Sequence, residues 1–189
     1  MLQNELLNDN VVIEHTKSWI IDVVVGCNFC PFAAREIQKN SIYYQVLRED
    51  RISEVLERLI LICEKMEEDK KIETAFLVFP TTFLNYMDYL DMLELAMDLL
   101  SAEDYDGIFQ LASFHPDYCF AGATNNDPAN YTNRSPYPML HILREESIEK
   151  AIENHPDIEN VPNDNIAFAK EKGLLYMEAL RNSCIGMKN

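Results

Sequence analysis

The sequence lacks the features that would place the protein in a membrane or in the secretory pathway. Its longest apolar stretches, "WIIDVVVG" and "LILIC", are far shorter than the roughly 18 residues that a membrane-spanning helix needs. The opening residues, "MLQNELLNDN", show no basic segment followed by an apolar one, so we expect no secretion signal. We therefore expect a cytoplasmic protein without a membrane partner.

The sequence also lacks any cluster of basic residues. Lys and Arg total 16 against 32 Asp and Glu, which gives a formal net charge of −16. The basic residues are scattered among acidic ones, as in "REDRISEVLERL" and "EKMEEDKKIE", a pattern typical of solvated helix faces. Because such a chain repels phosphate backbones, we expect no nucleic-acid partner. The oligomeric state stays open.

The cysteine content argues against a disulfide framework. The count is odd and no secretion signal is visible, so we expect reduced thiols at Cys27, Cys30, Cys63, Cys119 and Cys184. The C-x-x-C spacing of Cys27 and Cys30 leaves a redox pair as an alternative. A thioredoxin-like fold would need a strand leading directly into Cys27, whereas the segment before it has a helical pattern.

The chain shows no internal repeat and no Gly/Ser linker, which favours a single α/β domain over residues 1–189 with a flexible stretch at 1–10. Strand-like and helix-like segments alternate along most of it. This alternation predicts a mostly parallel sheet of three to five strands covered by helices. We expect helices at 11–25, 31–40, 51–70, 83–103, 145–155 and 163–182, and strands at 41–47, 73–80, 107–114 and 138–144.

Residues 114–138, after the third strand, form an unusually long segment without a helix or strand pattern. Its aromatic residues argue against disorder, and its Asn and Asp side chains are suited to closing turns. The segment leaves the carboxyl end of a strand, where open α/β sheets bind ligands. With one Arg and no Lys or Glu, it is predicted to be an ordered functional loop facing a pocket.

Two residues are candidates for catalysis. If a helix begins at Pro31, the thiol of Cys30 lies at its N-cap, where the helix dipole lowers a cysteine pKa. His115 directly follows a predicted strand, a suitable position for a general base. We therefore predict Cys30 as nucleophile and His115 as its base. The alternatives are that Cys30 packs as a small core residue and that His115 bonds to loop backbone.

Arg134 is the only cation of the loop and predicts recognition of a carboxylate or phosphate. Alternatively, it pairs with Asp127 or Asp117 and fixes the loop. The predicted substrate-binding residues are Asp127, Asn130, Thr132, Asn133, Arg134, Ser135 and His141.

A zinc site drawn from Cys30, His115, Cys119 and His141 is a further alternative, although only His115 and Cys119 are close in sequence.

Three motifs, "GCNFCPF", "SFHPDYCFAG" and "NYTNRSPYPMLHILRE", resemble the family known as domain of unknown function 1415. The resemblance runs from about Val11 to Gly173 and implies no particular activity. It implies that Cys30, His115, Arg134 and His141 belong to the family motif. Cys27 and Cys119 fall where the family has no cysteine, which weakens the redox pair and the four-ligand metal site.

Together these residues favour a thiol-dependent enzyme that transfers an acyl, amide or thiol group. Its expected substrate is a small anionic or amide-bearing molecule, and no resident cofactor is predicted. One alternative is a non-catalytic module that binds a ligand or another protein. Another is a metal-binding protein, with zinc or another transition metal held by Cys30, His115 and His141.

Overall fold

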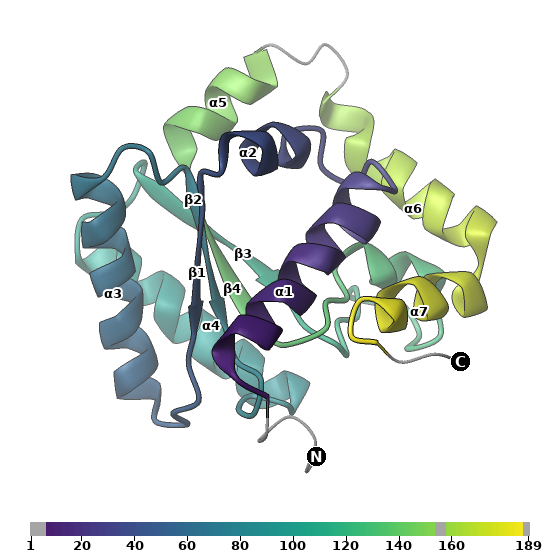
Figure 1. Cartoon of the computed structure of the whole chain (residues 1–189), viewed down its shortest axis with the longest axis horizontal. Helices are drawn as coiled ribbons and strands as arrows, with labels where there is room; N and C mark the ends of the chain where they lie inside the picture. Colours follow the sequence, from purple (N-terminus) through teal and green to yellow (C-terminus); the bar gives the residue numbers. More distant parts are fainter. Residues whose placement is uncertain (1–6, 154–157, 187–189) are drawn as a thin grey trace.

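Four strands form one mixed sheet at the centre of the protein (Figure 1). A computed structural model describes residues 7–153 and 158–186 of the chain. The strands lie in the order β1-β2-β4-β3. Their bounds are Ile42–Val46 for β1, Thr74–Val78 for β2, Phe109–Phe114 for β3 and Met139–Arg144 for β4.

The prediction of a mostly parallel sheet was wrong, although the four strands fall within the predicted three to five. β1 and β2 pair in parallel, whereas β4 pairs antiparallel with both β2 and β3. The first three strands do run in one direction, as strand–helix–strand crossovers require. The chain then turns back through the loop 115–138 and inserts β4 between β2 and β3. This insertion replaces one parallel pairing by two antiparallel ones.

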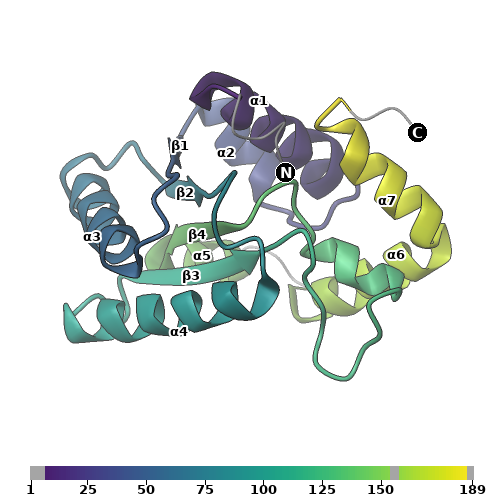
Figure 2. The same cartoon turned by 90° about the horizontal axis from the view of Figure 1, so that it is seen from below.

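Helices cover both faces of the sheet (Figure 2). One face packs against α3 (Ile52–Glu68) and α4 (Tyr86–Ala102), which connect consecutive strands. The other face packs against α1 (Asp9–Trp19) and its continuation η2 (Ile20–Val25), with α2 (Ala33–Lys39) beside them. The remaining helical segments are η3 (Pro128–Thr132), α5 (Glu145–Glu153), η4 (Ile158–Asn160), α6 (Val161–Lys172) and α7 (Leu174–Ser183).

The sequence of β2 does not alternate between apolar and polar residues, because the strand is covered on both faces. All five of its residues are buried. Ala75 and Leu77 belong to the core beneath α3 and α4, while Phe76 and Val78 belong to the core beneath α1 and η2. Because both faces are covered, both sets of side chains must be apolar. The two cores therefore lie on opposite sides of one sheet.

Several predicted boundaries need correction. The helix expected at 163–182 is two helices, separated at Gly173, whose φ of 81° lies in the left-handed region. The helix expected from Pro31 begins at Ala33. Of the stretch 1–10, residues 1–6 lie outside the described residues, and α1 already begins at Asp9. The predicted helix 145–155 is described only as far as Glu153.

The first helix changes its winding at its end. After α1, residues Ile20–Val25 form a π-helix, in which Gly26 N–H donates to the carbonyl of Ile21 at 3.0 Å. The wider winding brings the chain so close that a Cβ on Gly26 would lie 2.2 Å from the Asp22 oxygen. Only glycine fits there without rearrangement.

Among the described residues, no helix has the length and apolar character needed to cross a membrane.

Candidate functional site

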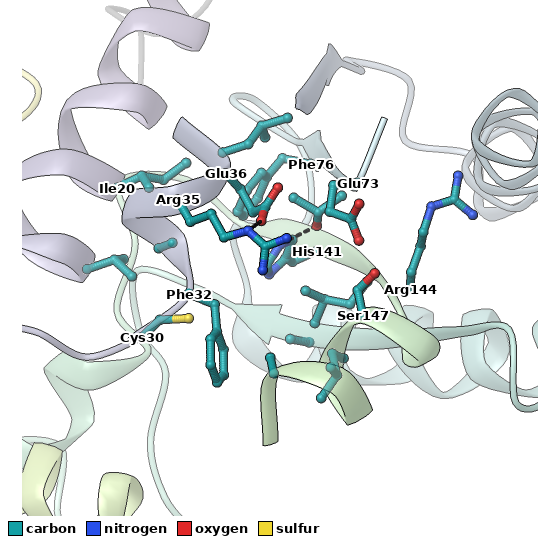
Figure 3. A pocket seen from close by; sticks show the side chains of 18 of the residues that line it. Ile20, Cys30, Phe32, Arg35, Glu36, Glu73, Phe76, His141, Arg144 and Ser147 are labelled. Atoms are coloured by element: carbon teal, nitrogen blue, oxygen red, sulfur yellow. Dashed lines mark hydrogen bonds and ion pairs between the residues drawn. The ribbon is translucent and has the colours of Figure 1, made fainter. Parts of the chain in front are cut away.

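A cavity of about 790 Å³ lies on the sheet face that α2 and η2 cover (Figure 3). Its volume suits a small molecule. The walls come from the end of α1, from η2, from the segment leading into α2 and from α5, through residues such as Trp19, Ile20, Val24, Phe32, Ile148 and Ala151. Most of these side chains are apolar. The cavity therefore favours a ligand with substantial hydrocarbon surface.

The floor of the cavity is built mainly from alternate residues of β2, β3 and β4, and Ile42 of β1 adds to the lining. Successive side chains of a strand point to opposite faces, so every second residue reaches the cavity. These floor residues are Thr74 and Phe76 from β2, Gln110, Ala112 and Phe114 from β3, and His141 and Leu143 from β4. His141 is thus the one predicted substrate-binding residue that lines this cavity. The other predicted substrate-binding residues lie in the loop 115–138, away from this cavity.

The hydrogen bonds of His141 fix its tautomer. Thr74 Oγ1 lies 2.6 Å from His141 Nε2 and 2.6 Å from the carbonyl oxygen of Ile142. The hydroxyl has one proton, and the carbonyl can only accept, so that proton goes to Ile142. His141 must then donate from Nε2–H to Thr74. Its other nitrogen, Nδ1, carries a lone pair, and no described residue donates to it.

The surroundings of His141 keep the ring neutral. The ring stacks on Phe76 with centroids 4.0 Å apart and planes 5° from parallel. Phe114 lies against it at 6.0 Å. Burial among these rings lowers the pKa of His141 to about 3, because the charged imidazolium loses its hydration there. His141 is therefore a neutral hydrogen-bond acceptor at physiological pH.

Cys30 is the second sequence-predicted residue that lines the cavity. It follows a tight turn in which Asn28 adopts a left-handed conformation with φ 57°. Asn165 of α6 holds this turn by donating from Nδ2 to the carbonyl of Phe29 at 2.8 Å. Figure 3 shows the sulfur of Cys30 turned toward the cavity. The thiol is half-buried and free.

The predicted N-cap position of Cys30 is wrong. Helix α2 begins at Ala33, and its N-cap residue is Phe32. The segment from Cys30 to Phe32 is a turn, closed by a backbone bond from Ala33 N–H to the carbonyl of Cys30 at 3.3 Å. Cys30 therefore lies before the helix and does not cap it. The expected dipole effect on its thiol has no basis in this geometry.

Charged side chains at the cavity include residues that the sequence did not single out. Glu36 of α2 accepts from the Ser41 hydroxyl at 2.6 Å and lies 3.4 Å from Arg35. Glu73, just before β2, accepts no hydrogen bond from a described residue, and its Oε1 is shielded from solvent. The only sequence signal for Glu73 was its position at the start of a buried strand. A solvent-exposed residue at the end of a strand would show the same signal.

His115 lies on the opposite side of the sheet from the cavity. It is fully buried against Tyr86 and Tyr89 of α4, and it does not line the cavity. Its Nε2–H donates to the carbonyl of Phe83 at 3.0 Å, and its Nδ1 accepts from the N–H of Asp117 at 2.9 Å. Both ring nitrogens are thus occupied, and burial lowers the pKa. The predicted pair of Cys30 and His115 is not assembled.

Arg134 is used inside the loop. Its Nε donates to the carbonyl of Tyr118 and its Nη2 to the carbonyl of Asn125, both at 2.9 Å. The guanidinium also lies over the ring of Tyr131, 4.9 Å from the centroid. Only 9% of the residue is exposed. Arg134 therefore fixes the loop, and it does so through backbone carbonyls where we had considered an aspartate.

The other predicted substrate-binding residues of the loop also bond to the loop itself. Asp127 caps η3 by accepting from Ala129 N–H, and Asn130 bridges Phe120 N–H and the Thr124 carbonyl. Side-chain hydroxyls bond to nearby carbonyls, Thr132 to Ala129 and Ser135 to Tyr137. The side-chain amide of Asn133 lies beside the Thr132 hydroxyl, with 2.9 Å between their polar atoms. The loop is ordered as predicted, but residues 115–138 do not line this cavity.

Residues 11–179 match the family model described as "Protein of unknown function (DUF1415)". The chain belongs to the DUF1415 family. Comparisons with curated proteins and with solved structures find no match. Membership therefore assigns no reaction, and the site must be interpreted from its own geometry.

Within this DUF1415 protein, the motif residues separate into two groups. Cys30 and His141 line the cavity, while His115 and Arg134 hold the loop together. No group of three or more His, Cys, Asp and Glu side chains in the described part of the chain is arranged to hold a metal ion. The alternative set of Cys30, His115 and His141 is split between the two faces of the sheet. The set that included Cys119 is not assembled either.

Proposed function

We propose that this protein binds a small, largely apolar molecule in the cavity on the α2 side of the sheet. One observation carries the proposal. His141 is held as a neutral acceptor whose Nε2–H is occupied by Thr74 and whose Nδ1 has no partner among the described residues. A ligand hydroxyl or N–H at Nδ1 would complete the hydrogen bonding of the ring.

The apolar walls support the same proposal. A polar acceptor placed on a largely hydrocarbon surface orients a ligand, while the surrounding apolar contacts supply most of the affinity. The low pKa of His141 keeps the acceptor neutral over the whole physiological range. A neutral acceptor of this kind favours recognition over proton transfer, because a base with so low a pKa removes protons poorly.

Thiol chemistry is the second candidate function, and the position of Cys30 favours it. The thiol lines the same cavity as His141. A bound carbonyl compound near Sγ would be attacked there, giving a thioester and releasing the leaving group with the thiol proton. A second nucleophile would then take the acyl group and restore the thiol. This enzyme would use Cys30 without His115 or Arg134.

The proposed function is tested with two probes that differ by one hydroxyl group, phenethyl alcohol and ethylbenzene. Binding is followed by ligand-observed NMR. We expect both probes to bind, with the alcohol binding more tightly. In His141→Phe, which keeps a ring stacked on Phe76 and removes Nδ1, the preference for the alcohol should disappear. His15→Gln is the matched control, because His15 bonds to Tyr137 outside the cavity.

Failure of both probes to bind would overturn the proposed binding site. An unchanged preference in His141→Phe would contradict the role of Nδ1. Catalysis is tested separately with thioester and ester forms of the same aryl group. Turnover that is lost in Cys30→Ala and retained in His115→Asn would support the thiol enzyme as the second candidate.

A further inference from the structure

Glu73 is the least satisfied charged group at the cavity. No described residue donates to either of its carboxylate oxygens, and Oε1 is shielded from solvent. A shielded carboxylate oxygen without a hydrogen bond is unfavourable, because that oxygen has lost water and gained no partner. Figure 3 shows the side chain of Glu73 at the cavity, near the labelled His141 and Arg144 in this view. Glu73 therefore brings to the cavity wall a carboxylate to which no described residue donates a hydrogen bond.

The cations near the cavity make other contacts. Arg144 donates from Nε to the carbonyl of Ile72 at 3.1 Å and from Nη2 to the carbonyl of Met66. Arg35 lies beside Glu36, and Lys150 pairs with Glu146 on the exposed surface of α5. The charge of Glu73 acts on Lys150 at longer range and contributes to raising the pKa of that lysine. This long-range effect leaves the oxygens of Glu73 without a hydrogen bond.

Two residues with an unpartnered acceptor therefore line the apolar cavity, Glu73 with its carboxylate and His141 with Nδ1. From this arrangement we propose that the natural ligand is an apolar amine whose ammonium group donates to Glu73, with a further N–H or hydroxyl able to reach His141. The inference rests on the proposed function, since it names the ligand class of the same cavity. The net charge of −16 would also attract a cation toward the protein.

The ligand class is tested with three probes that share one aromatic ring, namely phenethylamine, phenethyl alcohol and phenylacetate. Their dissociation constants are measured by titration calorimetry or NMR at neutral pH. We expect the amine to bind at least about tenfold more tightly than the alcohol, because a hydrogen bond to a charged acceptor is worth more than one to a neutral acceptor. Phenylacetate should bind most weakly.

The residue responsible is identified with a matched pair of variants. Glu73→Gln should remove the advantage of the amine while the alcohol still binds. Glu36→Gln removes the same charge from the same cavity, but Glu36 already accepts from Ser41, so the amine should keep its advantage there. Cys30→Ser is included to separate the ligand class from thiol chemistry, and amine binding should survive in it.

The outcomes separate the two proposals. If the alcohol binds but the amine has no advantage, or phenylacetate binds best, the amine inference is wrong and the cavity remains a binding site. An equal loss in Glu73→Gln and Glu36→Gln would also overturn the inference, because general charge would then explain the effect. If none of the three probes binds, the proposed function fails and the amine inference fails with it.

Discussion

His141 donates its Nε2–H to the hydroxyl oxygen of Thr74, and the two atoms are 2.6 Å apart. The contact joins the central strands β2 and β4, and the same hydroxyl donates onward to the carbonyl of Ile142. The bonds form a short chain with one direction, from the imidazole to the hydroxyl to the backbone. Its consequence is that Nδ1, the other nitrogen of this cavity-lining ring, carries a lone pair and can accept a hydrogen bond.

Replacing Thr74 by Val tests this chain. The variant keeps the shape of the side chain but removes the acceptor of His141 and the donor to Ile142. We expect a loss of about 1–3 kcal/mol in the free energy of unfolding, because a buried donor is left unpaired. Thr74→Ser keeps the hydroxyl and should stay closer to the parent protein. Urea unfolding measures both, and equal stability of Thr74→Val and the parent would contradict the chain.

The low pKa of His141 predicts how stability depends on pH. In the unfolded chain the ring has its ordinary pKa of about 6.5, whereas in the folded protein the pKa is about 3. Between these values the unfolded state binds the additional proton, so stability falls as the pH is lowered from 6.5 toward 3. One such group contributes a slope of up to about 1.4 kcal/mol per pH unit.

His141→Phe isolates this contribution. Burial also lowers the pKa values of His15 and His115, so the parent should lose stability in acid through all three rings. Urea unfolding at pH 5 and pH 6 should show a smaller slope for the variant, by up to the amount expected for one proton. His15→Gln serves as comparison, with a smaller change because His15 is less shielded. Parallel slopes for the parent and His141→Phe would exclude the depressed pKa.

The sequence allowed the elements to be predicted better than their arrangement. Short apolar runs rich in β-branched and aromatic residues identified all four strands, and helical periodicity identified the helices between them. Both signals are local in sequence. The position of β4 is not local, since it depends on whether the chain after residue 138 pairs with β3 alone or enters between β2 and β3. Nothing in "PMLHILR" distinguishes a central antiparallel strand from a parallel one.

The candidate site was predicted in part for the same reason. Cys30 and His141 were chosen for their chemistry, and both line the cavity. His115 and Arg134 were chosen on equally good chemistry, yet their polar atoms are used by backbone groups of the loop and of Phe83. A long loop must satisfy its own backbone, and that need uses the same residue types as a binding site. Glu73 and Thr74 were not singled out from the sequence, because their roles depend on neighbours distant in sequence.

Gly26→Ala tests the π-helix that leads to Cys30. A Cβ at this position would meet the backbone oxygen of Asp22, which cannot move aside as a flexible side chain would. We expect a loss of about 1–3 kcal/mol and a displaced Cys30 turn. Gly122→Ala is a control with a different cause of strain, since its φ is 78° but nothing lies within 4 Å of the added atom. If Gly26→Ala unfolds at the same urea concentration as the parent, the wider winding is not needed.

Arg134→Lys distinguishes a structural role from the ligand contact predicted from the sequence. Lysine keeps the charge but cannot reach the carbonyls of Tyr118 and Asn125 with a fixed fork of donors. We expect the variant to lose about 1–3 kcal/mol of stability while probe binding in the cavity is unchanged. Weaker probe binding without a loss of stability would instead restore Arg134 as a ligand-binding residue.

The reactivity of the five cysteines, which are all free thiols, tests the cavity without a functional assay. Burial raises the pKa of Cys63 to about 12 and that of Cys184 to about 11, and it also raises the pKa of Cys27. These three thiols should resist iodoacetamide at pH 8, because the thiolate is the reactive form. Cys30 and Cys119 are half-buried and should be alkylated first.

A cavity ligand should separate these two thiols. Phenethylamine at saturating concentration should slow the alkylation of Cys30, which lines the cavity, and leave that of Cys119 unchanged. Cys119 lies in the loop, with its sulfur near the Ala123 carbonyl at 3.5 Å, so it reports any general effect of the amine. Peptide mass spectrometry follows both residues in one sample. Equal protection of the two thiols, or alkylation of Cys30 at an unchanged rate in the saturated protein, would mean that the probe binds outside the cavity.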